Sequence, residues 1–201
     1  MLSAFNANSL RAKLIKFDTD QQLAFGAICC ERLLPNYIAF QQDVGWGDIA
    51  PIRKALDFVW SFLGSKSVDT QAVESITDSC ESVAPDSEDF ESLYVSSAQD
   101  ACFAVCGLLD FLLENSVDKI VQAATYATDS VDLYVQEIED MAPNDPELEQ
   151  KILNHRLMQR ELAQQEKDFT EIEQATTLSS DFLDGLKQSW NNEGKSNLDL
   201  P

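Results

Sequence analysis

The sequence predicts an all-α fold, a single-domain bundle of eight or nine helices around a buried central helix. Apolar residues recur at spacings of three and four along most of the chain, and no segment alternates apolar with polar residues as a half-buried strand does. No Asn-Gly or Asp-Gly pair joins two alternating runs, so the hairpin signal is missing. Only seven glycines occur in 201 residues, as expected where few turns need a positive φ.

The first part of the chain predicts five helices, which cover 9–17, 20–35, 36–44, 48–64 and 70–83. The second follows Asp20, a good N-cap, and ends at Pro35, because proline disfavours a continuing helix. Its stretch 23–30 carries no charge, so we expect it to be buried on most sides. The turn Gly45-Trp46-Gly47-Asp48 then redirects the chain into the fourth helix.

The remaining chain predicts four more helices, which cover 96–115, 117–142, 146–175 and 180–190. The segment 96–115 is apolar nearly all round, which predicts the central helix of the core. Asp145 and Pro146 suit the N-cap and first position of the helix that follows the break at 141–146. We expect one helical domain over 1–194 and a mobile C-terminal tail over 195–201.

Negative charge is concentrated in the middle of the chain. The formal net charge is −21, and residues 67–150 contain twenty acidic side chains but one basic side chain, Lys119. Such a surface repels phosphate backbones and anionic lipid, so we expect no nucleic-acid and no membrane partner. Two explanations stay open for the charge, a solubilising face and a docking face for a basic protein.

Sequence motifs of common enzymes are missing. There is no phosphate-binding loop, no dinucleotide fingerprint and no Gly-x-Ser-x-Gly elbow. His155 is the only histidine, which excludes the paired Glu-x-x-His ligands of ferritin-like di-iron bundles. A histidine at the edge of the core is therefore favoured over a general base. We expect no cofactor and, on balance, no enzyme.

Cysteine usage and the first residues predict a cytoplasmic protein. Five cysteines, an odd number that includes adjacent Cys29 and Cys30, make a poor disulfide framework. Polar Asn6, Asn8 and Ser9 occupy the place of the apolar core of a signal peptide, and no apolar run reaches about 20 residues. Zinc binding would need thiolates from two helix interiors, so we expect core packing and no metal.

The segment from residue 31 to residue 60 is the densest in polar and aromatic side chains. Arg53, Asp57 and Trp60 share one helix face at i, i+4 and i+7. One interpretation is a buried ion-pair network with Trp46 covering the core, and the other is a pocket or partner groove. The candidate binding residues are Glu31, Arg32, Tyr37, Trp46, Asp48, Arg53, Asp57 and Trp60.

The same segment resembles a known family. The chain is similar to the YjaG-like family of small bacterial proteins of unknown function in the residues Cys30-Glu31-Arg32, Pro35-Asn36-Tyr37, Phe40, Gly45-x-Gly47-Asp48, Arg53, Leu56-Asp57 and Trp60, and further on in Asp100-Ala101-Cys102 and Ala104. The resemblance implies a bacterial, cytoplasmic, helical protein. It transfers no catalytic residue.

The sequence therefore favours a non-enzymatic interaction or regulatory protein with an acidic docking face for a basic partner. The candidate docking residues are Asp86, Glu88, Asp89 and Glu91, in the loop before the predicted central helix. The alternative is an enzyme or small-ligand binder that uses the 31–60 cluster. The sequence leaves a homo-oligomer possible.

Overall fold

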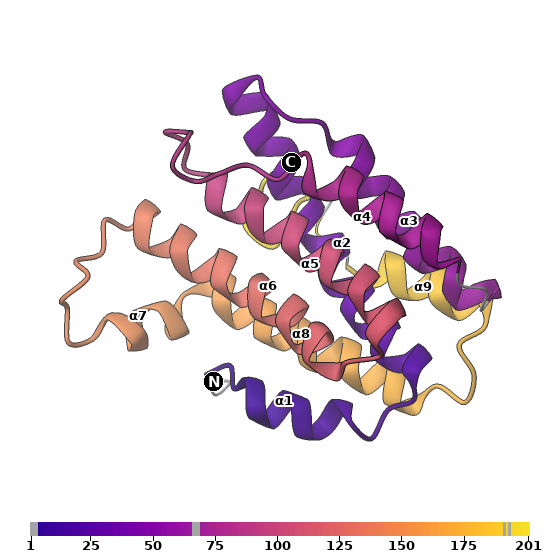
Figure 1. Ribbon diagram of the computed structural model, residues 1–201. Coiled ribbons are helices and arrows are strands. Elements are labelled where there is room, and N and C mark those ends of the chain that lie inside the picture. The colour runs from indigo at the N-terminus through magenta and orange to yellow at the C-terminus, as the bar shows by residue number, and fades with distance from the viewer. Residues whose placement is uncertain (1–3, 66–68, 191, 193) are drawn as a thin grey trace.

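The structure, a computed structural model, describes residues 4–65, 69–190, 192 and 194–201. Within these residues the chain forms helices and no strand, so the predicted all-α fold is confirmed. The helices pack into one bundle, with α6 lying between α5 and α8 (Figure 1). The described residues form nine helices: α1 (Ala7–Leu14), α2 (Thr19–Val44), α3 (Ile49–Ser65), α4 (Thr70–Glu81), α5 (Val95–Glu114), α6 (Val117–Ile138), α7 (Leu148–Asn154), α8 (Arg156–Gln174) and α9 (Ser180–Ser189).

Helix α2 is the centre of the bundle. It contacts α3, α5, α6, α8 and α9, and its uncharged run from Leu23 to Cys30 is buried throughout. The sequence predicted α5 as the buried central helix, and α5 shares the core with α2. Helix α5 packs against α2, α3, α4 and α6, while its Phe103 and Leu113 are 41% and 42% exposed. The side of α5 that faces solvent is therefore itself partly apolar.

Helix α2 continues through Pro35, where a break was predicted. It begins after Asp18, whose carboxylate accepts a hydrogen bond from the Gln21 amide, and ends at Gly45 in the left-handed conformation. A proline inside a helix removes one amide donor and costs about 3 kcal/mol. The buried residues on either side of Pro35, including Leu33 and Tyr37, offset that cost by packing in the core.

The predicted helix 146–175 is two helices, because the chain leaves the helical conformation at His155. The backbone of His155 is extended, and its Nδ1 atom accepts a hydrogen bond from the Leu157 amide at 3.3 Å. His155 thus ends α7 and caps α8. This structural role fits a histidine at the edge of the core.

The segment 195–201, predicted as a mobile tail, is packed into the bundle. Ser196 and Asn197 are fully buried, and Leu198 is 2% exposed. The Asn197 side-chain amide donates to the Ala127 carbonyl of α6 at 2.9 Å, and its oxygen accepts from Asn36 of α2 at 3.0 Å. Polar composition suggested a solvated tail, but these polar groups find their partners on α2 and α6. The packed unit therefore extends to Leu200.

In the part of the chain that the structure describes, two helices, α2 and α5, are long and apolar enough to cross a membrane by length and composition alone. Most of each helix is buried against other helices, as in the core helix of a globular protein. Their hydropathy follows from their place in the core, so it is weak evidence for a membrane span.

Replacing Asn197 with alanine tests the packed C-terminal segment. Asn197→Ala leaves the buried amide of Asn36 without its partner and removes the additional bond to the Ala127 carbonyl, so we expect the free energy of unfolding to fall by about 1–3 kcal/mol. The measurement is urea unfolding followed by circular dichroism. The exposed Asn144→Ala is the control and should change the free energy by less than about 0.5 kcal/mol. Equal effects of the two substitutions would contradict the packed segment.

Candidate functional site

The eight candidate binding residues of the 31–60 segment do not form one site. Glu31, Arg53, Asp57 and Trp60 come together between α2 and α3, whereas Arg32 points to the opposite side of α2 and meets α8. The other three residues, Tyr37, Trp46 and Asp48, lie at the corner where α2 turns into α3.

Glu31 is the acceptor for two side chains of α3. Its two carboxylate oxygens accept from Arg53 at 2.6 and 3.0 Å in a fork, and one of them also accepts the indole N–H of Trp60 at 2.7 Å. Asp57 accepts from Arg53 at 2.7 Å, one helical turn away. Charge-assisted, bidentate hydrogen bonds of this kind fix the relative position of two helices. Glu31 therefore clamps α3 onto α2.

The Glu31 clamp is partly shielded from water. The Arg53 side chain is 35% exposed and that of Glu31 19%, and the Lys187 ammonium of α9 lies 4.7 Å from the centre of the Trp60 ring. Burial by itself lowers the pKa of Arg53, but the hydrogen bond and charge of Glu31, with the charge of Asp57, outweigh it and raise the pKa. The guanidinium is thus held charged and occupied by carboxylates of the same chain.

Arg32 lies in the interior with both of its carboxylate partners. Arg32, Glu161 and Asp168 have side chains that are 0% exposed. Glu161 accepts from two guanidinium nitrogens at 3.0 and 3.2 Å, and Asp168 accepts from a third at 2.6 Å. The Ile28 carbonyl and the Cys29 sulfur take the remaining N–H groups at 3.2 and 3.5 Å. All five donors of the guanidinium therefore have partners.

The Arg32 triad carries one buried negative charge in excess when both carboxylates are ionised. Burial raises the pKa of Asp168, although the charge of Arg32 opposes that rise. Gln165 donates to Glu161 at 2.9 Å and Gln164 donates to Asp168 at 2.7 Å, which distributes the excess charge over neutral amides. The ring of Trp190 lies 5.6 Å from the guanidinium carbon. Sequestered in this way, Arg32 offers no contact to an external anion.

Tyr37 fixes the corner between α2 and α3. Its buried hydroxyl donates to the Val83 carbonyl at 2.7 Å and accepts from the Asp48 amide at 3.1 Å. Gly47 has φ +94°, and a Cβ there would lie 2.5 Å from the Tyr37 oxygen, so only glycine fits. The Asp48 carboxylate caps α3 through the Ala50 amide. Burial raises the pKa of Tyr37 to about 12, which keeps the phenol neutral.

Trp46 connects this corner to the acidic loop. Its ring is 39% exposed and lies 5.0 Å from the ring of Phe90, and both rings meet Phe40 edge-on, with centres 6.1 and 5.2 Å from that of Phe40. Phe90 belongs to the loop that carries the candidate docking acids. The structure thus places the exposed indole beside the acidic loop 86–91, two features that are far apart in the sequence.

The acidic loop 86–91 has a defined conformation. The Asp86 carboxylate accepts from the Glu88 amide at 3.0 Å, the Asp86 carbonyl accepts from the Asp89 amide at 3.1 Å, and the Pro85 carbonyl accepts from Gln99 of α5 at 3.0 Å. Asp86, Glu88, Asp89 and Glu91 are all exposed. Within the described residues none of these four carboxylates has a Lys or Arg partner in an ion pair. The loop therefore presents its negative charge to solvent.

A groove lies next to the acidic loop, between the loop, the start of α5 and the second half of α6. We call it the α5–α6 groove. Its volume is about 390 Å³. The residues that line it are Phe90, Glu91, Ser92, Leu93, Ser96, Ser97, Ser130, Leu133, Tyr134 and Glu137. None of the eight candidate binding residues of the 31–60 segment belongs to this lining.

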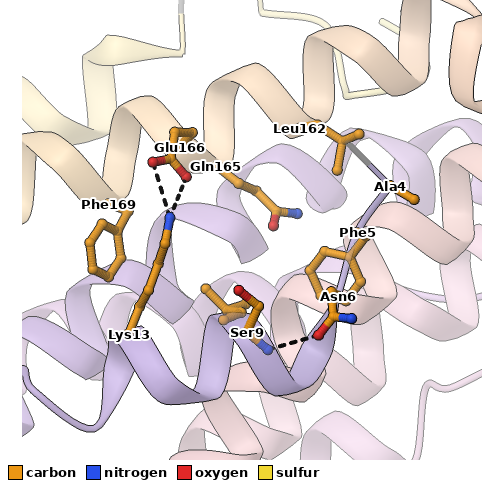
Figure 2. A pocket seen from close by; sticks show the side chains of 10 residues that line it. Ala4, Phe5, Asn6, Ser9, Lys13, Leu162, Gln165, Glu166 and Phe169 are labelled. Carbon is orange, nitrogen blue, oxygen red and sulfur yellow. Dashed lines mark hydrogen bonds and ion pairs between the residues drawn. The ribbon is translucent and has the colours of Figure 1, made fainter. Parts of the chain in front are cut away.

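A second cavity lies between α1 and α8 and has a volume of about 370 Å³ (Figure 2). Its charged groups are already paired, because the Lys13 ammonium donates to both Glu166 oxygens at 3.0 and 2.7 Å. The Gln165 side chain points into the cavity, and its amide nitrogen donates to Glu161 and the Ala124 carbonyl. Asn6 caps α1 through the Ser9 amide. These polar groups are therefore already bonded to other residues of the chain.

The five cysteines are free and buried. Burial raises the pKa of the Cys29 thiol to about 12 and that of the Cys102 thiol further still, which disfavours thiolate. Among the described residues no three His, Cys, Asp or Glu side chains gather as a metal site. Packing accounts for the positions of the thiols, and the absence of a bound metal stays a prediction.

Sequence reasoning missed three residues that matter here. Glu161 and Asp168 stand seven apart on α8 in a Glu/Gln-rich stretch, and the only sequence signal for their burial against Arg32 is the helix face that they share. Asp100 was noticed only through the family resemblance. It accepts a hydrogen bond from Ser130 of α6 at 2.7 Å, and Ser130 lines the α5–α6 groove.

The fold and these groups define a class, an all-α bundle whose buried Arg32 is paired with carboxylates of the same chain and whose acidic loop 86–91 has no Lys or Arg ion-pair partner within the described residues. A family model described as "Protein of unknown function (DUF416)" matches residues 9–200, and the chain belongs to that family. The family resemblance seen in the sequence is thereby confirmed.

Relatives and a solved structure agree with this assignment. The chain is similar to "Uncharacterized protein YjaG" of Escherichia coli, with 33% identity over 102 residues, which is 51% of this chain and 52% of that relative's length. An uncharacterized protein of Haemophilus influenzae is 25% identical over 96% of this chain and 97% of its own. A crystal structure of a DUF416 family protein from Shewanella baltica superposes with a TM-score of 0.84 over 98% of this chain and 99% of that one, at 24% identity, and supports the fold.

The pKa of Asp100 makes stability depend on pH in a defined direction. Burial raises this pKa from 3.8 to about 7, against the Ser130 hydrogen bond and with a smaller contribution from Asp129. A carboxyl with a raised pKa in the folded state stabilises the fold fully below its unfolded pKa, and this contribution is lost as pH rises to about 7. Ionised Asp100 therefore costs stability above pH 7.

Asp100→Asn should remove that cost. We expect the variant to gain stability relative to wild type as pH rises from 4 to 8, by at most about 4 kcal/mol, the equivalent of the pKa rise. Urea unfolding at several pH values measures the difference between the two proteins. The exposed Asp89→Asn is the control, and its difference from wild type should stay nearly constant. A constant difference for Asp100→Asn as well would contradict the burial of an ionisable carboxyl.

Proposed function

We propose that this protein is a non-enzymatic interaction or regulatory protein of the cytoplasm, which binds a basic protein through the acidic loop 86–91. The observation that carries the proposal is the contact between Trp46 and Phe90. It sets a partly exposed aromatic side chain beside four exposed carboxylates that have no Lys or Arg partner within the described residues. Aromatic anchors and complementary charge are the features that protein interfaces use for affinity and for rapid association.

The distribution of bases supports the same proposal. Most basic side chains of the described residues form ion pairs with carboxylates of the same chain, as Arg32 does with Glu161 of α8 and Arg53 with Glu31. The surplus of acids over 67–150 therefore stays uncompensated at the surface. Such a field attracts a basic partner and is screened over about 8 Å at physiological salt.

The alternative, an enzyme or small-ligand binder at the 31–60 cluster, has less support. Arg32 and Tyr37 are fully buried, Trp60 is 5% exposed, and each of the three is bonded within the chain. The two cavities described above do not include them in their linings. These residues instead hold α2 against α3 and α8.

Affinity capture from the cytoplasm of the source cells tests the proposed function. We expect a basic protein to be captured at low salt and lost at high salt, and its amount to fall at least about tenfold when Asp86, Glu88, Asp89 and Glu91 are replaced by Asn or Gln. Mass spectrometry identifies and quantifies the captured proteins.

The matched control removes four exposed carboxylates elsewhere, with the substitutions Glu74→Gln, Asp78→Asn, Glu147→Gln and Glu149→Gln. Both variants have the same net charge, so a loss specific to the loop variant supports docking by that loop. If the captured proteins are unchanged by the loop variant and by salt, acidic docking is wrong. The charge would then serve solubility.

A further inference from the structure

The α5–α6 groove has apolar sides that are open to solvent. Leu93, at the edge of the acidic loop, is 43% exposed, and Leu133, on α6, is 48% exposed. Ser130, Leu133 and Glu137 stand at spacings of three and four, so they present one face of α6 to the groove. Two half-exposed leucines, one from the segment before α5 and one from α6, line a cavity of about 390 Å³ that can receive an apolar side chain.

The groove has a negative rim. Glu91 and Glu137 are exposed at its two sides, and within the described residues neither has a Lys or Arg partner in an ion pair. The last turn of α6 contains no base to offset the negative end of its dipole. Arg156, whose charge reaches Tyr134 in the groove wall, is already paired with Asp199 at 2.6 Å. A cation from a partner would therefore meet unneutralised charge.

The N-terminus of α5 contributes a positive partial charge to the groove. The start of α5 lies at the groove, and its dipole is positive at that end. Glu91 stands four residues before Val95 and offsets this partial charge. Glu137, the end of α6 and the acidic loop 86–91 then leave the whole groove negative.

We propose that the α5–α6 groove receives a basic amphipathic helix of the partner protein. The apolar face of that helix inserts between Leu93 and Leu133, and its Lys or Arg side chains face Glu91, Glu137 and the acidic loop. This inference rests on the proposed function and names the binding site and the chemistry of the partner. Helix-in-groove binding uses anchors at i, i+3 or i+4 and i+7, a spacing that suits a groove walled by a helix.

Charge argues against a second copy of this chain as the occupant. Two copies that met by the same groove would bring Glu91 and Glu137 of each close to those of the other, and like charges in contact repel. Among the described residues, ion pairs already occupy many of the bases that a different docking mode would need. The bases already held in ion pairs at 3.0 Å or less are Arg11, Lys13, Arg32, Arg53, Lys119, Lys151, Arg156 and Arg160.

A defined peptide tests the groove. The probe is a fluorescein-labelled peptide of 18 residues, built from leucine and lysine in helical periodicity, and fluorescence anisotropy measures its binding to the full chain at low salt. We expect Leu93→Ser and Leu133→Ser each to weaken binding about tenfold, because each removes one apolar wall. Leu113→Ser, on α5 but outside the groove and equally exposed at 42%, is the matched control and should change affinity less than about twofold.

The variants separate this inference from the proposed function. Weakening by Leu93→Ser and Leu133→Ser but not by Leu113→Ser supports the groove. Equal affinity of the three variants, with binding lost in the four-residue variant of loop 86–91, overturns the groove and leaves acidic docking in place. No saturable binding of the peptide overturns the groove, and the capture experiment then decides acidic docking on its own. Methyl NMR spectra give a second readout, in which the Leu93 and Leu133 signals should shift on binding and the Leu113 signals should not.

Discussion

The buried guanidinium of Arg32 is the constraint on which the arrangement of the C-terminal third depends. Two carboxylates of α8 must reach it, so the face of α8 that carries Glu161 and Asp168 has to lie against α2. The C-terminal segment then packs on α2 beside Arg32, since the backbone amide of Asn197 donates to the backbone carbonyl of Arg32 at 3.2 Å. A buried ion pair is a weak source of net stability, but leaving one partner alone is costly, so the triad selects one packing.

The pairing of Arg32 and Arg53 with carboxylates of the same chain affects the charge of the surface. Arg32 neutralises carboxylates of α8 and Arg53 neutralises Glu31, so these two bases are unavailable to the acids of α4, α5 and α6. The acidic loop 86–91 and the α5–α6 groove stay negative for that reason. The proposed docking face and the buried triad are in this view two consequences of one distribution of charge.

Local patterns in the sequence predicted the helices whose apolar spacing is regular, such as α6, and the ion pair between Arg53 and Asp57 at i, i+4. Local patterns failed where contacts between distant segments determine the conformation. Helix α2 passes through Pro35 because buried residues flank it, and the segment 195–201 is ordered by partners on α2 and α6. The contact of Trp46 with Phe90 joins segments 44 residues apart in the sequence, which no local pattern reports.

The most direct test of this account is the stability of Arg32→Met beside that of the triple variant Arg32→Met, Glu161→Gln, Asp168→Asn, measured by urea unfolding. The single variant strands two buried carboxylates, so we expect it to lose about 3–5 kcal/mol. The triple variant removes all three charges and should recover at least about half of that loss. A single variant within about 0.5 kcal/mol of wild type, or a triple variant less stable than the single one, would contradict the central place of the Arg32 triad.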